Sequence, residues 1–157
     1  MPKSGLQLVS RFDSVDSALL AELQADARLP FAELGRRVSL STPAVIERVR
    51  KLEDIGAIRG YHAQIDPAAV GLPLRAFIKV TIAGDKLERF AAVARRVPEV
   101  RECHRVTGAE SFIVQIAVRD VAHLEQVIDS LAPYVATQTS IVLASIIDWN
   151  PVIPSAP

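Results

Sequence analysis

The sequence lacks the features that mark several large classes of protein. Its 157 residues include a single cysteine, Cys103, which excludes a disulfide framework and a cysteine-rich zinc site. No apolar run approaches the roughly 20 residues of a membrane span, and the first residues lack the apolar core of a signal peptide. We therefore expect a protein of the reducing cytoplasm.

The chain also has no net charge, because 18 basic residues balance 18 acidic ones. The whole chain therefore has no bias toward nucleic acid or an anionic membrane. The balance is uneven locally, since residues 36–59 hold six basic and three acidic side chains, for a net charge of +3. This segment is where a polyanion would bind.

Apolar residues at helical spacing fill the first half of the chain and predict three short helices. The first begins after Asp13 or Ser14, and the second opens near Pro30, because proline suits a first helical turn. The third covers residues 42–55 and ends at Gly56. The apolar positions are Val15, Leu19, Leu20, Leu23, Leu34, Val38, Val45, Val49 and Leu52.

The hydrophobic period changes in the second half. Alternation over residues 76–82 and 112–118 predicts two strands with one buried face each. Each is followed by a helical pattern and then by another extended stretch, residues 100–106 and 139–147. This repeated strand, helix, strand order is that of a ferredoxin-like sheet with both helices on one face. We expect the other face to be apolar enough to need a cover.

These patterns predict an α+β fold of two domains. Residues 12–60 form a winged helix-turn-helix domain, and residues 61–73 form an extended hinge. Residues 74–148 form a ferredoxin-like αβ sandwich. The tail, residues 149–157, has three prolines and is expected to be a flap or disordered.

The predicted helix at residues 42–55 is the candidate recognition helix, which enters the major groove of DNA in a helix-turn-helix. Its free N–H groups beside Ser41 suit a phosphate, and Ile46 is placed either to pack in the core or to meet a thymine methyl. The alternative is an ordinary amphipathic helix with a solvated charged face. The candidate DNA-binding residues are Arg36, Ser41, Thr42, Pro43, Ala44, Ile46, Glu47, Arg48, Arg50 and Lys51.

A set of residues in the first half follows one recognisable pattern: Asp16, Ala27, Arg28, Glu33, Leu34, Leu40, Ser41, Val45, Arg48, Val49, Leu52, Glu53, Gly56, Ala57, Ile58, Gly60 and Tyr61. In these residues the first half resembles the Lrp/AsnC, or feast/famine, family of transcription regulators, which sense amino acids. The spacing from Leu40 to Ile58 follows the family pattern without a gap. Gly35 and Ser39 depart from it, because the family often has alanine and glycine there.

The resemblance continues in the second half and covers about residues 13–147. It implies that the sandwich is the family's effector-binding RAM domain. In this family two RAM sheets pack face to face, so the resemblance implies a homodimer and leaves tetramers and octamers open. The matching residues are Pro98, Glu99, Val100, Cys103, Val106, Thr107, Gly108 and the stretch 139–143.

The loop at residues 106–111 is the candidate effector site. Gly108 permits a positive φ or a close approach of backbone to a ligand. The resemblance places an amino-acid effector at the RAM interface, with Glu110 on its ammonium and Ser111, Thr139 or Ser140 on its carboxylate. Many family members carry Asp where Ser111 stands. The alternative is a simple turn with a solvated Glu110. The full predicted set is Val106, Thr107, Gly108, Ala109, Glu110, Ser111, Thr139 and Ser140.

No residue pattern points to catalysis, a metal or a cofactor. His62, His104 and His123 lack metal-ligand spacing and are expected to be surface or packing residues. The predicted function is a sequence-specific, DNA-binding transcription regulator that responds to an amino acid or a related small metabolite and recognises a pseudo-palindromic operator. Two alternatives remain open: an enzyme resembling siroheme decarboxylases, and a ligand-sensing module without DNA binding.

Overall fold

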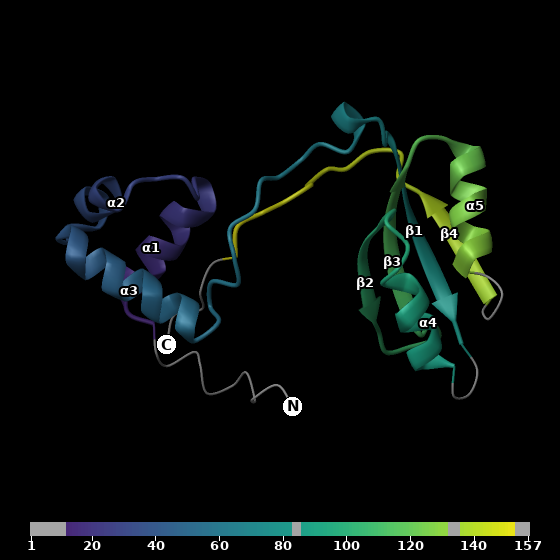
Figure 1. The fold of residues 1–157 in the computed structure, drawn as a ribbon, viewed down its shortest axis with the longest axis horizontal. Helices are drawn as coiled ribbons and strands as arrows, with labels where there is room; N and C mark the ends of the chain where they lie inside the picture. Colours follow the sequence, from purple (N-terminus) through teal and green to yellow (C-terminus); the bar gives the residue numbers. More distant parts are fainter. Residues whose placement is uncertain (1–11, 83–85, 132–135, 153–157) are drawn as a thin grey trace. The chain divides into compact units, whose positions relative to one another are not determined.

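The computed structural model describes residues 12–82, 86–131 and 136–152 (Figure 1). The polar first residues, 1–11, and the end of the proline-rich tail, 153–157, lie outside these described residues. The chain divides into two units. The helical unit holds the described residues up to Ala63 and those from Ile147 onward, and the sheet unit is Gln64–Ile146.

The helical unit contains the three predicted helices, α1 (Ser14–Ala25), α2 (Phe31–Val38) and α3 (Thr42–Asp54). Asp13 caps α1 and Pro30 precedes α2, as predicted. The core comes from one stripe of each helix, so that Leu19, Leu34 and Val45 are fully buried. The longest helix, α3, has 13 residues, and no helix in the described part of the chain could span a membrane.

The helical unit differs from the predicted winged domain in one respect. Residues 12–63 contain no strand, so the wing is absent from this part of the structure. After α3 the chain runs without regular structure to a 3₁₀ turn, Ala68–Val70. Within the stretch predicted as an extended hinge, Asp66 accepts a hydrogen bond from the Ala68 N–H at 3.0 Å and so forms a local turn.

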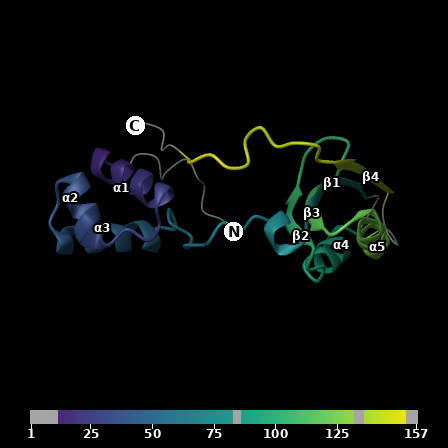
Figure 2. The same cartoon turned by 90° about the horizontal axis from the view of Figure 1, so that it is seen from above.

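The sheet unit has the predicted ferredoxin-like order. Its elements are β1 (Leu74–Thr81), α4 (Leu87–Ala94), β2 (Val100–Arg105), β3 (Phe112–Val118), α5 (Val121–Leu131) and β4 (Ala136–Ile141). The strands lie in the order β2-β3-β1-β4, and every neighbouring pair is antiparallel. Both helices cover the same face of the sheet (Figure 2). Ile78 and Val114 are fully buried beneath them.

The open face of the sheet is mixed rather than apolar, which corrects the prediction. Opposed residues of an antiparallel pair point to the same face. On β1, Phe77 pairs with Gln115 and Ser140, while Lys79 pairs with Ile113 and Gln138. Phe77 remains 40% exposed. Apolar and polar side chains therefore share this face.

The last strand and the tail also differ from the prediction. β4 ends at Ile141 instead of residue 147, because Ile141 pairs with Ala76 near the start of β1 and little of β1 remains to pair with. Further on, the Val152 N–H donates to Gln24 Oε1 at 2.7 Å and Gln24 Nε2 donates to the Val152 carbonyl at 3.0 Å. Within the described residues, the tail is thus attached to α1 and is not a free flap.

Candidate nucleic-acid interface and ligand loop

The turn between α2 and α3 depends on a close backbone approach. Ser39 adopts the left-handed region, with φ 58 and ψ 41, and the Leu40 N–H donates to the Gly35 carbonyl at 2.8 Å. A Cβ at Gly35 would lie 2.5 Å from the Leu40 carbonyl oxygen. Gly35 is therefore required by the turn, whereas Ser39 holds a conformation that suits glycine better.

Helix α3 is anchored along one side and open along the other. Val45 and Val49 are at most 2% exposed. Ile46 keeps 45% of its surface exposed, so it lies on the open side and not in the core. Ala44 is half-buried. Besides Ile46, the exposed predicted DNA-binding residues of the turn and α3 are Ser41, Thr42, Pro43, Glu47, Arg50 and Lys51.

Arg48 does not stand free beside these residues. Its Nη1 donates to Asp13 Oδ2 at 2.7 Å and to Asp16 Oδ1 at 2.8 Å. In this structure the guanidinium that was predicted to contact DNA is held by these two carboxylates. Helical periodicity places Arg48 on a flank of α3 but carries no sign that the start of α1 lies against that flank.

Arg36 is paired as well. Its Nε and Nη2 donate to the two carboxylate oxygens of Glu33 at 2.9 and 2.7 Å. Arg37 also donates a hydrogen bond to this carboxylate. The hydrogen bonds from Arg36, followed by the one from Arg37, lower the pKa of Glu33 to about 2. Among the basic residues of α3, only Arg50 and Lys51 lack an ion pair with the described part of the chain.

The loop at residues 106–111 joins β2 to β3 and is open at its tip. Thr107 and Ala109 are exposed. Gly108 has a φ of 122, and a Cβ added there would meet no atom of the described residues within 4 Å. The positive φ of Gly108, and not crowding within the chain, is therefore what favours glycine at this position. Glu110 faces Lys79 at 4.0 Å, a neighbour that sequence reasoning missed because it lies on another strand.

Ser111 has an internal role. Its Oγ accepts a hydrogen bond from the Ile82 N–H at 3.0 Å, and its own N–H donates to the Val80 carbonyl at 2.7 Å. The hydroxyl therefore ties the loop to the end of β1. This occupies the group that was predicted to bind an effector carboxylate.

Thr139 and Ser140 lie away from the loop within one protomer. Thr139 pairs with Ile78 and Ser140 with Phe77, so the two side chains point to opposite faces of the sheet. The loop is bonded to β1 at Val80 and Ile82. Ser140 pairs with Phe77, five residues before Ile82, so at about 3.3 Å per residue it lies roughly 17 Å along the strand direction from Ile82. A single chain does not gather the predicted effector residues into one cluster.

Comparison with known proteins decides the family. Residues 12–53 match the AsnC-type helix-turn-helix domain, and residues 75–152 match the Lrp/AsnC ligand binding domain. The chain is 33% identical to the transcriptional regulator LrpC of Bacillus subtilis over 87% of this chain and 94% of LrpC. The chain belongs to the Lrp/AsnC family. It is an HTH-type transcription regulator.

Solved structures of Lrp/AsnC regulators share this fold. The structure of B. subtilis LrpC gives a TM-score of 0.85 at 32% identity, over 88% of this chain and 99% of that one. A Neisseria meningitidis transcriptional regulator in complex with L-methionine gives 0.84 at 35% identity, over 90% and 96%. A feast or famine regulatory protein of Mycobacterium tuberculosis, also complexed with L-methionine, gives 0.83 at 34% identity, over 90% and 99%.

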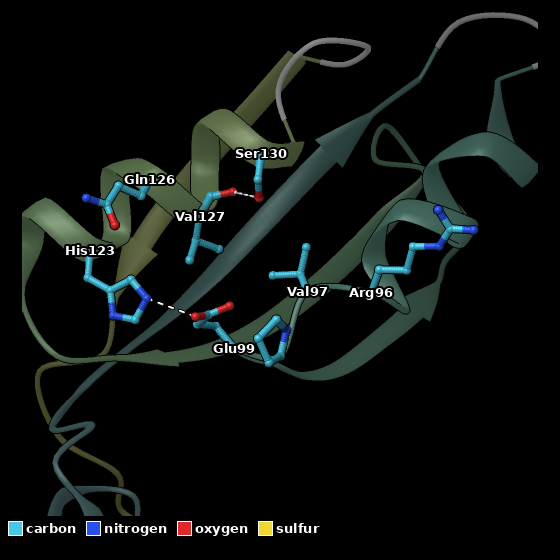
Figure 3. A pocket seen from close by; sticks show the side chains of 8 residues that line it. Arg96, Val97, Glu99, His123, Gln126, Val127 and Ser130 are labelled. Carbon is cyan, nitrogen blue, oxygen red and sulfur yellow. Dashed lines mark hydrogen bonds and ion pairs between the residues drawn. The ribbon is translucent and has the colours of Figure 1, made fainter.

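This Lrp/AsnC regulator also has an open groove between the turn that joins α4 to β2 and helix α5 (Figure 3). His123 is 7% exposed, and its Nε2 lies 2.9 Å from Glu99 Oε1 (Figure 3). The Arg119 N–H donates to its Nδ1 at 3.3 Å. Both ring nitrogens are thus engaged, and His123 is a packing residue, as expected from the sequence.

Proposed function

We propose that this regulator binds double-stranded DNA with the open side of α3, and that a small amino acid bound at the sheet unit changes this binding. The observation that carries the proposal is the pair Arg50 and Lys51, exposed beside Ile46 on a helix whose opposite side is buried. Cations of this kind neutralise phosphates, and an apolar side chain such as Ile46 can meet a thymine methyl.

The start of α3 adds polar groups to the same side. Ser41 precedes the helix, and its side chain makes no capping hydrogen bond. Its hydroxyl, with the first backbone N–H groups of α3, suits a phosphate oxygen. Glu47 is placed to accept from a cytosine amino group. Arg36 contributes less, because Glu33 binds its guanidinium through two hydrogen bonds.

DNA binding itself is tested with a labelled fragment from upstream of the protein's own gene. We expect a gel shift at nanomolar to micromolar protein that an unlabelled random fragment competes away only weakly. A ligand-sensing module without DNA binding would give no shift with any fragment. We also propose that the protein works in the cytoplasm and has no enzymatic activity, in keeping with the naming of its relatives as transcriptional regulators.

We further propose that the protein is at least a homodimer. Support comes from the segment after β4, where Leu143 is 96% exposed and Ile146 is 93% exposed. Such side chains gain free energy when a second copy covers them. A dimer also doubles the contacts of one short recognition helix, with half-sites one helical turn of DNA or a multiple apart.

Light scattering is expected to give at least twice the 17.0 kDa chain mass at micromolar concentration. Replacing Leu143 and Ile146 together by aspartate should shift the assembly toward monomer, because each charge would have to be buried at the interface. Replacing the exposed Val121 of α5 by aspartate serves as the control and should leave the mass unchanged. A monomeric wild-type protein would contradict the proposal.

The proposed effector is an amino acid, and the relatives complexed with L-methionine make it the first ligand to try. Because the predicted residues do not meet within one protomer, we propose that the site forms where two sheet units adjoin. The loop then contributes its backbone around Gly108 and the Glu110 carboxylate, which suits an ammonium group. Thr139 and Ser140 would reach the ligand from another copy.

A thermal-shift screen of the common amino acids is expected to find a ligand that raises the melting temperature, because it binds only the folded protein. Gly108→Val should weaken that ligand at least tenfold in calorimetric titration, since valine disfavours a positive φ. Glu110→Gln should weaken an ammonium-bearing ligand more than a neutral one. Gly71→Val, at another glycine with a positive φ and open surroundings but outside the loop, is the matched control. Wild-type affinity in both loop variants would place the effector elsewhere.

A further inference from the structure

Arg48 links two helices that are far apart in the sequence. Its Nη1 lies 2.7 Å from Asp13 Oδ2 and 2.8 Å from Asp16 Oδ1. Asp13 and Asp16 belong to the start of α1, whereas Arg48 lies in the middle of α3. The Asp16 side chain is 3% exposed and that of Arg48 is 32% exposed. The contact of Arg48 with Asp16 is therefore partly shielded from water, where such pairs are stronger than on an open surface, whereas the Asp13 side chain is 51% exposed.

The same two carboxylates also cap α1. Asp13 Oδ1 accepts from the Asp16 N–H at 2.8 Å, and Asp16 Oδ2 accepts from the Asp13 N–H at 3.3 Å. Each carboxylate thus uses one oxygen for the capping box and the other for Arg48. The Asp16 N–H and then Arg48 hold the pKa of the Asp13 carboxyl below its ordinary value. The two capping hydrogen bonds and the two hydrogen bonds from Arg48 together fix the start of α1.

The charges in this cluster do not favour DNA at Arg48. Two carboxylates surround one guanidinium, so the cluster carries a net negative charge when Asp13 and Asp16 are ionised. That charge suits the positive end of the α1 dipole. It also cancels any positive potential that Arg48 would offer to a phosphate.

We propose that Arg48 is a positioning residue, which holds the recognition helix α3 against the start of α1 and makes no contact with DNA itself. This inference rests on the proposed DNA binding of α3. The positive charge that DNA meets on α3 then comes from Arg50 and Lys51, while Arg48 decides the angle at which α3 presents them.

The test compares Arg48→Ala with Arg50→Ala in the full-length protein. DNA affinity is measured by fluorescence anisotropy between 50 and 200 mM salt, well below the melting temperature of each variant. A lost phosphate contact lowers the slope of log affinity against log salt by about 0.9 in each protomer. A recognition helix held at the wrong angle weakens DNA binding but leaves the number of phosphate contacts, and therefore the salt slope, unchanged.

We expect Arg48→Ala to lower the melting temperature by roughly 5–10 °C, because it leaves the buried Asp16 carboxylate unpaired. DNA affinity should fall about five- to tenfold with an unchanged salt slope. Arg50→Ala should leave the melting temperature unchanged and reduce the slope. If Arg48→Ala does not fold, Arg48→Gln keeps a donor for the carboxylates, and its salt slope is expected to equal that of the wild type.

Two results would overturn the inference while leaving the proposed function intact. A salt slope reduced by the Arg48 variants as much as by Arg50→Ala would make Arg48 a DNA contact. An unchanged affinity with a lowered melting temperature would make it a purely structural residue. A wild-type protein that binds no DNA would overturn both the inference and the proposed function.

Discussion

Replacing Arg50 and Lys51 together by alanine is expected to lower DNA affinity about 100-fold near physiological salt. Both side chains are exposed on the open side of α3 and have no ion pair with the described residues. Two cations lost from each protomer of a dimer remove up to four phosphate contacts. The slope of log affinity against log salt should therefore fall by up to about 3.6.

The control removes the same charge from the other unit. Lys86 and Arg101 are exposed on the sheet unit, and their double alanine variant should bind DNA as the wild type does. Both double variants should melt at the wild-type temperature, because exposed substitutions of this kind change stability by less than about 0.5 kcal/mol. Equal affinities in all three proteins would mean that α3 is not the DNA-binding helix.

Gly35→Ala is expected to destabilise the helical unit by about 2–3 kcal/mol, because the new Cβ has no room in a tightly packed turn. It would lie 2.5 Å from the Leu40 carbonyl oxygen. That carbonyl cannot withdraw easily, since the Leu40 N–H is bonded to Gly35 itself. The corresponding fall in melting temperature is roughly 10–20 °C for a unit of this size.

Whether Gly35→Ala destabilises or stabilises the helical unit is what tests the close approach in the turn. Helix propensity alone predicts that alanine in place of a helical glycine stabilises by up to about 1 kcal/mol. The matched variant Ser39→Gly should have the opposite effect and stabilise by about 0.5–1 kcal/mol, because glycine adopts the left-handed region without strain. Urea titration followed by circular dichroism measures both. A stabilised Gly35→Ala would refute the close approach at Leu40.

The effector loop illustrates what a motif can and cannot predict. The run of residues 106–111 between two alternating stretches predicted a loop, and Gly108 within it permitted a positive φ, which the structure has. The role of Ser111 could not be predicted in this way. Its hydroxyl partner, Ile82, lies 29 residues earlier in the chain, and only the antiparallel pairing of β1 with β3 brings the two together.

Arg48 and Gly35 show the same limit in the helical unit. Periodicity correctly separated the buried side of α3 from its remaining sides. It could not distinguish a flank that faces solvent from one that faces another helix, so Arg48 was grouped with Arg50. At Gly35, propensity predicted a cost, but the position of the Leu40 carbonyl makes glycine necessary.

Local patterns in the sequence were sufficient to predict the helices, the four strands of the sheet, their order and the family. The spacing of apolar residues within a short stretch of sequence shows which side of a helix or strand is buried, and the family pattern consists of such local spacings. Which polar side chains are engaged in hydrogen bonds or ion pairs with other elements became clear only from the tertiary structure. Arg48 meets Asp13 across 35 residues, and contacts over that distance depend on how whole helices and strands pack, which no local pattern encodes.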